Sequence, residues 1–151
     1  MSKAYIVMIE DNPAEVTLLR MALEQHQEPF ELAVLSDGAE ALRFVSERHT
    51  AIRSVKHSEE EPCVVLLDLH LPKYDGLEVL AAMRREPRLS HIPVVILTSG
   101  EVRPEEAAKI RSHGALFREK PRQFSEVLQL AADVLELCKS SVEQAFSPAF
   151  G

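Results

Sequence analysis

Two acidic residues, Glu10 and Asp11, follow directly after the apolar run Ala4–Ile9. A third acidic residue, Asp68, follows the apolar residues 64–67. An apolar run without polar alternation is typical of a strand that is covered on both faces of its sheet. A carboxylate at the end of such a strand must stay solvated or paired, because burying an isolated charge is costly. The three acids are therefore candidates for a functional site.

Polar residues also follow two later apolar runs. Thr98 and Ser99 come after the run 93–97, and Lys120 follows the short segment 115–118, of which residues 115–117 are apolar. Each of these residues alone has an ordinary explanation, such as a cap, a turn or an exposed surface position. Their occurrence at the ends of several apolar runs favours one shared site, because neighbouring parallel strands end at the same edge of a sheet.

The residue types indicate which chemistry such a site could perform. Two like charges about 5 Å apart repel by roughly 3 kcal/mol at an effective dielectric near 20. Three carboxylates in one crevice therefore need a cation, and Mg²⁺ typically binds one or two carboxylates and keeps several waters for a phosphate-bearing partner. Lys120 would supply a second positive charge. A carboxylate between a metal ion and a lysine suits phosphoryl transfer, which depends mainly on positioning and charge.

The elements that would position these residues follow from short apolar runs that alternate with segments of helical period. We expect strands at 4–9, 30–35, 63–67, 93–97 and 115–118, and helices at 13–25, 38–48, 76–86, 104–113 and 123–140. Asn12, Pro13 and Glu15 together are typical of a helix start with a capping box. Five strands alternating with five helices predict an α/β fold, a doubly wound parallel sheet with helices on both faces.

Length and composition predict one globular domain. The chain has 151 residues, of which 46% are hydrophobic and 27% charged. We assign the domain to residues 1–140 and expect 141–151 to be a tail without an output domain. The net charge of −7 argues against nucleic acid as a partner, since such binding depends on clustered Lys and Arg. No apolar run approaches the roughly 20 residues that a membrane span needs, so we expect no membrane association.

The two cysteines, Cys63 and Cys138, lie in apolar surroundings in the sequence. They have no spacing typical of a zinc site, and no secretory signal precedes them. We therefore expect both to be reduced core residues of a cytoplasmic protein.

Together these features resemble the receiver domain of two-component response regulators, over about residues 3–139. The matching motifs, in order, are Glu10-Asp11, Asp68 within LLDLHLPKYDG, Thr98-Ser99 and Lys120-Pro121. The resemblance implies a flavodoxin-like, CheY-like sheet with strand order 2-1-3-4-5. The motif EDNPAE, the longer loop before the third strand and the run LSHIPVVILTSG are closer to stand-alone regulators that pair with bacterial phytochrome-type histidine kinases.

The resemblance also implies roles for the residues. Asp68 would accept a phosphoryl group from a phosphohistidine of a histidine kinase, with a bacteriophytochrome as one candidate. The groups that would bind Mg²⁺, or Mn²⁺ in its place, are Glu10, Asp11, Asp68 and the backbone carbonyl of His70. The residues that would bind the phosphoryl group or switch with it are Thr98, Ser99, Lys120 and Phe117. The chain would then be a phosphoacceptor that catalyses its own phosphotransfer and dephosphorylation, not an enzyme with a separate substrate.

Other functions are weighed against this one. An aspartyl-phosphate phosphatase would need a second acid two residues after Asp68, where His70 stands. A nucleotide-binding protein or a flavodoxin-like electron carrier would need a glycine-rich turn in place of Glu-Asp-Asn-Pro. A receiver-like module that is not phosphorylated stays open as an alternative, although such modules usually lack the acceptor Asp or the Lys. A phosphorylated chain would signal through protein contacts, or act as a phosphate sink or relay intermediate.

The helix expected at 123–140 has an apolar arc wider than packing on a sheet requires. We expect Leu130, Val134 and Leu137 to stay exposed in a monomer. With the strand at 115–118, they would form the face of a homodimer with twofold symmetry. The alternative is that the tail, with Phe146 and Phe150, folds back over them.

Overall fold

The structure, a computed structural model, describes residues 3–50 and 61–146, without the side chains of 48–50 and 141–146. Five parallel strands form one sheet in the order β2-β1-β3-β4-β5, which confirms the predicted fold class and strand order. The strands are β1 (Ala4–Ile9), β2 (Phe30–Leu35), β3 (Val64–Asp68), β4 (Val94–Thr98) and β5 (Leu116–Glu119). The helices are α1 (Pro13–Gln25), α2 (Gly38–Thr50), α3 (Gly76–Arg85), α4 (Pro104–Ser112) and α5 (Phe124–Phe146).

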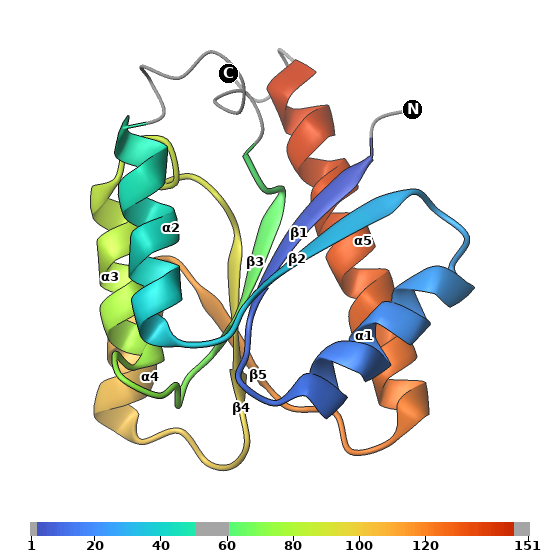
Figure 1. Cartoon of the computed structure of the whole chain (residues 1–151), viewed down its shortest axis with the longest axis horizontal. Helices are drawn as coiled ribbons and strands as arrows, with labels where there is room; N and C mark the ends of the chain where they lie inside the picture. Colours follow the sequence, from blue (N-terminus) through green and yellow to red (C-terminus); the bar gives the residue numbers. More distant parts are fainter. Residues whose placement is uncertain (1–2, 51–60, 147–151) are drawn as a thin grey trace.

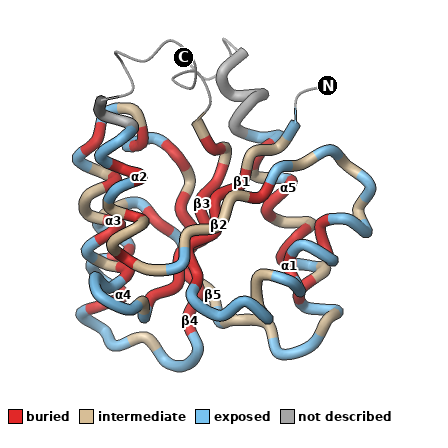
Figure 2. Tube along the Cα trace, in the orientation of Figure 1, coloured by how far each residue is buried: buried red, intermediate tan, exposed pale blue. Residues whose placement is uncertain are grey.

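The sheet separates two apolar cores. Helices α2, α3 and α4 cover one face, and α1 and α5 cover the other (Figure 1). In β1, Val7 and Ile9 belong to the first core, while Ile6 and Met8 belong to the second. Successive strand side chains point to opposite faces, so a central strand with helices on both sides must be apolar throughout. Figure 2 shows this as continuous burial along the central strands. No helix in the described part of the chain is long and apolar enough to cross a membrane.

The later strands end one residue beyond the predicted positions. Asp68 pairs with Leu97, and Thr98 pairs with Glu119, so the acid and the threonine are the last residues of β3 and β4. Both residues are held by backbone pairing with the neighbouring strand. This pairing cannot be inferred from the residue types alone. Their side chains are therefore fixed by the sheet and not by a loop.

Helix α1 begins as predicted, with one difference. Asn12 Oδ1 accepts a hydrogen bond from the backbone N–H of Ala14 at 3.0 Å, and Pro13 is the first helical residue. The expected capping box does not form, because the N–H of Asn12 donates to Glu10 Oε2 at 3.1 Å and not to Glu15. The side chain of Glu15 is directed elsewhere, as described below.

The prediction that both cysteines are reduced is wrong. Cys63 and Cys138 form a disulfide, with a Cα–Cα distance of 5.0 Å and a sequence separation of 75 residues. Cys63 directly precedes β3, and α5 packs on the sheet at this point. The proximity depends on how α5 lies across the sheet, which residue spacing cannot show.

The expected exposure of α5 is also wrong in part. Leu130 and Val134 are only 3% and 1% exposed, and Leu137 is half-buried. Helix α1 packs beside α5 in the same core and covers the wider apolar arc. Among the large apolar side chains of the described residues, Leu116 of β5 is the most exposed, at 61%.

Helix α5 is longer than predicted. It continues to Phe146, six residues beyond the expected end at residue 140, so the first part of the expected tail is helical. Phe150, which the alternative interpretation placed over the apolar face of α5, lies outside the described residues.

Candidate functional site

The carboxyl ends of β1 and β3 bring the three acids together. Ile9 pairs with Leu67 in adjacent parallel strands, so the residues that follow them emerge side by side. One carboxylate oxygen from each acid lies within 4.8 Å of the others, in the group Glu10, Asp11 and Asp68. The grouping that the sequence suggested is thus present in the structure.

The three acids differ in burial. Glu10 and Asp68 are 2% and 5% exposed, whereas Asp11 is exposed. Burial raises the pKa of Glu10 to about 7, and the charge of Asp68 adds to this increase. The nearby ammonium group of Lys120 and a hydrogen bond from the N–H of Asn12 oppose the rise in this pKa. Near neutral pH, both protonation states of Glu10 are therefore populated, and the ionised form can act as a charged ligand.

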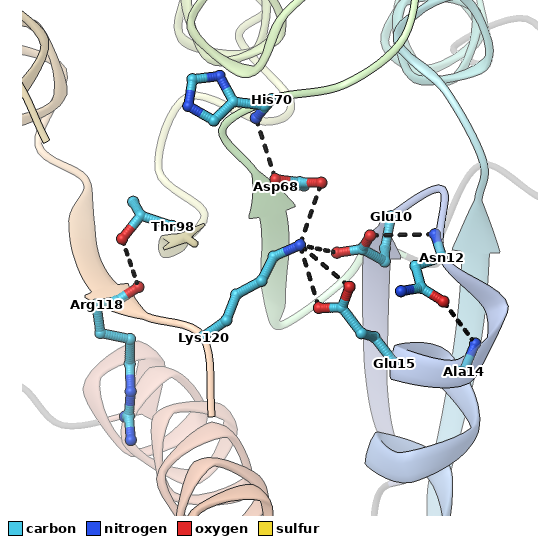
Figure 3. A network of polar contacts seen from close by, with 9 residues as sticks. All are labelled: Glu10, Asn12, Ala14, Glu15, Asp68, His70, Thr98, Arg118 and Lys120. Atoms are coloured by element: carbon cyan, nitrogen blue, oxygen red, sulfur yellow. Dashed lines mark hydrogen bonds and ion pairs between the residues drawn. The ribbon is translucent and has the colours of Figure 1, made fainter. Parts of the chain in front are cut away.

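Lys120 lies at the centre of the acids (Figure 3). Its Nζ is 3.0 Å from Glu10 Oε1, 3.1 Å from Glu15 Oε1 and 3.4 Å from Asp68 Oδ2. Burial lowers the pKa of Lys120, but the close contacts with the carboxylates of Glu10 and Glu15 and the charge of Asp68 raise it above its ordinary value. The ammonium group is therefore held charged beside Asp68.

Glu15 is a site residue that the sequence reasoning missed. Its position three residues after Asn12 indicated a capping role, whereas its carboxylate contacts Lys120 through both oxygens, at 3.1 and 3.3 Å. The two residues are 105 positions apart. The only available signal was a third acid in the motif EDNPAE, and that signal does not distinguish capping from a site contact.

The carboxylate of Asp68 is held from two sides. Its Oδ1 accepts a hydrogen bond from the backbone N–H of His70 at 3.0 Å, while Oδ2 faces Lys120. The start of α3 packs closely against this backbone, since a Cβ on Gly76 would lie 2.5 Å from the carbonyl oxygen of Asp68. Glycine at this position allows the chain to turn tightly after β3. The side chain of His70 is exposed and makes no described contact with the acids.

The other predicted residues lie around this centre without contacting Asp68. Thr98 is buried, and its hydroxyl is directed to the carbonyl oxygen of Arg118 at 3.5 Å and not to Asp68 (Figure 3). Ser99 is exposed. Phe117 is half-buried, with the guanidinium of Arg111 5.5 Å from its ring centre.

The donor set fits a divalent cation. Glu10, Asp11 and Asp68 bring carboxylate oxygens within 4.8 Å of one another, and Lys120 contacts Glu10 and Asp68 from this group. Glu10 Oε1 is buried and accepts no hydrogen bond of good geometry, although Lys120 Nζ lies 3.0 Å away. Oxygen donors in this number and an incompletely satisfied carboxylate are what hard cations such as Mg²⁺ and Mn²⁺ require.

The comparison with protein families decides the classification. The model of the response regulator receiver domain matches residues 6–132. The chain belongs to the response regulator receiver family. The family match is to a receiver domain and not to a family of enzymes, and it covers all the site residues named above.

Relatives of this receiver include regulators associated with phytochromes. Response regulator Rcp1 from Synechocystis is 31% identical over 129 residues, covering 85% of this chain and 84% of Rcp1. The phosphorylated cyanobacterial phytochrome response regulator RcpA has a TM-score of 0.76 at 28% identity, covering 93% of this chain and 96% of RcpA. The bacteriophytochrome response regulator AtBRR is 38% identical with a TM-score of 0.62, covering 91% and 95% of the two chains.

A solved structure of Rcp1 in its Mn²⁺-bound form is also similar to this receiver. Its TM-score is 0.71 at 29% identity, and the match covers 87% of this chain and 91% of that one. The predicted resemblance to receivers, and to phytochrome-associated regulators among them, is confirmed.

Proposed function

We propose that this receiver accepts a phosphoryl group on Asp68 from a phosphohistidine of a histidine kinase. The main support for the proposal is the environment of the Asp68 carboxylate at the carboxyl end of β3. Asp68 is held by the N–H of His70, faces the ammonium of Lys120 and shares its crevice with two further acids. This arrangement supplies a positioned nucleophile and a fixed positive charge, the main requirements of phosphoryl transfer.

In the proposed step, a carboxylate oxygen of Asp68 attacks the phosphorus atom and the phosphorus–nitrogen bond to the histidine breaks. The imidazole leaves and takes up a proton, while Lys120 neutralises charge on the phosphoryl oxygens. Hydrolysis returns the receiver to its unphosphorylated state. Water attacks the same phosphorus, inorganic phosphate is released and the carboxylate is restored. The ammonium group of Lys120 already lies 3.4 Å from Asp68 Oδ2 before the transfer.

A divalent cation would be held by Glu10, Asp11, Asp68 and the backbone carbonyl of His70. When bound, it supplies positive charge next to the transferred group. The donor set described above and the Mn²⁺-bound form of the relative Rcp1 support Mg²⁺ or Mn²⁺ as this cation.

Signalling would then depend on Thr98 and Phe117. The hydrogen bond from the Thr98 hydroxyl to the Arg118 carbonyl is long, at 3.5 Å, so its loss costs little when the hydroxyl turns to a phosphoryl oxygen. Ser99 lies next to it and can add a second donor. Phe117 is half-buried and would fill space that Thr98 leaves.

We infer a phytochrome-type kinase, including bacteriophytochromes, as the phosphodonor. The support is the relatedness to RcpA and AtBRR, whose names associate them with phytochromes. Such signalling is cytoplasmic, and its output is a phosphorylation-dependent protein contact. A phosphate sink or relay intermediate is the second candidate, and phosphotransfer from the receiver to a histidine of a further protein would favour it.

We further propose that the chain forms a homodimer through β5 and α5. A groove of about 450 Å³ lies between Leu116, Phe117 and Leu137, with Leu116 61% exposed beside it. Its edge carries Arg118 and Asp133, paired at 2.8 Å, which offers both charge signs to a second copy. Leu130 and Val134 form the buried floor of the groove instead of its contact surface.

Asp68→Asn tests the phosphoacceptor. The amide keeps the shape but lacks the nucleophilic oxygen, so labelling by a phytochrome-type kinase or by acetyl phosphate should vanish. Labelling of the wild type should require Mg²⁺ and stop with a chelator. The control Glu24→Gln, at an exposed position of α1, should be labelled like the wild type. Acid-labile phosphate that persists on Asp68→Asn would contradict the assignment.

Leu116→Glu tests the dimer by light scattering. The introduced charge should yield a monomer at concentrations where the wild type is dimeric, because a desolvated carboxylate has no partner in the interface. Leu18→Glu, at an exposed apolar residue of α1, is the control and should leave the dimer intact. A wild type that stays monomeric, phosphorylated or not, would refute the proposal.

A further inference from the structure

All three N–H donors of Lys120 have an acidic partner within reach. The ammonium group can donate three hydrogen bonds, and Glu10, Glu15 and Asp68 lie 3.0, 3.1 and 3.4 Å from its Nζ. A phosphoryl group on Asp68 adds oxygens that need the same donors. The donor that faces Asp68 Oδ2 can turn to the phosphoryl group, but any further donor reaches it only when Lys120 weakens its contact with Glu10 or Glu15.

The three partners differ in what they lose when Lys120 moves. The side chain of Glu10 is 1% exposed, so loss of the Lys120 contact would leave a buried carboxylate with only the hydrogen bond from the N–H of Asn12. Asp68 itself carries the phosphoryl group and stays beside the lysine. The side chain of Glu15 is 31% exposed and can be rehydrated, and its place in the first turn of α1 keeps it near the positive end of the helix dipole. Glu15 is the partner that Lys120 can leave most easily.

Two other roles for Glu15 do not match the contacts. A capping role would require its carboxylate to accept from the N–H of Asn12, which instead donates to Glu10 at 3.1 Å. A direct place among the metal ligands is also not supported, because the group of mutually close acid oxygens comprises Glu10, Asp11 and Asp68. The contact that uses both Glu15 oxygens is the one with Lys120.

We propose that Glu15 is a positioning residue that competes with the phosphoryl group for Lys120 and so favours the unphosphorylated receiver. This inference rests on the proposed function of Asp68. The Lys120–Glu15 pair is present before phosphorylation and is lost or weakened afterwards, so it stabilises the first state over the second. The negative charge of Glu15 also repels the phosphoryl oxygens at short range.

The experiment measures binding of beryllofluoride, a stable stand-in for the phosphoryl group, by ¹⁹F NMR at saturating Mg²⁺. Glu15→Gln removes the competing charge, and the dissociation constant should fall by about two- to fivefold, the range expected for a partly exposed ion pair. Glu24→Gln removes the same charge from an exposed position of the same helix and should leave the dissociation constant unchanged. The control therefore separates the specific contact from the net charge.

The sign of the change separates competition from a purely structural role. A residue that only supports the fold would, when replaced, lower both the unfolding free energy and the affinity for beryllofluoride. Competition predicts tighter binding in Glu15→Gln together with an equal or lower unfolding free energy of the free protein. Unchanged or weaker binding in Glu15→Gln would overturn the proposal while the proposed function stands. A wild type that binds no beryllofluoride would overturn both.

Discussion

Glu10 is the residue whose protonation should affect stability most visibly. Its pKa in the folded protein is about 7, above the ordinary 4.5. The folded state therefore binds this proton more tightly than the unfolded state, and the wild type should lose stability as pH rises through that window. Glu10→Gln does not titrate and should not lose this stability.

Urea unfolding of wild type and Glu10→Gln in a chelator, from pH 5 to pH 8, measures this effect. The unfolding free energy of the variant should rise relative to that of the wild type as the pH increases. The difference should reach the order of 3 kcal/mol at pH 8, because each unit of pKa difference corresponds to 1.36 kcal/mol. Lys120 keeps Glu15 and Asp68 as partners in the variant. Glu24→Gln serves as the exposed control, and its difference from wild type should not change with pH. A pH-independent difference for Glu10→Gln would contradict the assigned pKa.

At the residue scale, the sequence predicted the acids and Lys120 but not Glu15. Glu10 and Asp68 follow strands that are adjacent and parallel, so chain direction alone brings them to one edge. The contact between Glu15 and Lys120 depends on the angle at which α1 leaves β1. That angle is set by packing of α1 on α5, and no local pattern encodes it.

At the element scale, the loop between β3 and α3 is anchored to the start of α2. The N–H of Gly38 donates to the carbonyl of Pro72 at 3.1 Å, and Lys73 Nζ lies 3.4 Å from Asp37 Oδ2. A Cβ on Gly38 would overlap the carbonyl oxygen of Tyr74. The loop that begins just after Asp68 therefore depends on a residue of another element.

Gly38→Ala should lower the unfolding free energy by about 1–3 kcal/mol, because the overlap is with backbone and cannot be relieved by a side-chain rotation. Chemical denaturation measures the change. Gly100→Ala is the matched control, since a Cβ there meets no atom within 4 Å. Equal stability of the two variants would show that the loop is not packed against α2 in this way.

Helix caps could be predicted from the sequence, whereas the burial of a helix face could not. Asn12 and Asp75 cap α1 and α3 through their own side chains, and such local contacts can be inferred from residue type. Burial of α5 could not be inferred in the same way. The periodicity of one helix shows an apolar arc, but the burial of Leu130 and Val134 requires the knowledge that α1 lies beside α5.

At the scale of the whole molecule, the alternation of strands and helices was sufficient to predict the sheet and its two covered faces. Strand order came from the resemblance to receivers, and the structure agrees. The covalent connection between distant segments was not predictable. The sequence separation of 75 between Cys63 and Cys138 gives no indication that α5 returns to the beginning of β3.

The disulfide should contribute measurably to global stability. Closing a loop of 75 residues restricts the unfolded chain, which corresponds to about 4 kcal/mol in the loop-entropy model. Urea unfolding with and without a thiol reductant should show this loss on reduction. Thiol titration of the denatured protein should find no free thiol before reduction, since both cysteines of the chain are paired.

The double variant Cys63→Ala/Cys138→Ala is the control for the reductant itself. Its unfolding midpoint should not respond to reductant, because it has no bond to break. Its stability should lie near or below that of the reduced wild type, since replacing the buried Cys138 by alanine also removes packing atoms. Two free thiols in the unreduced wild type, or an equal midpoint with and without reductant, would show that β3 and α5 are held together by packing alone.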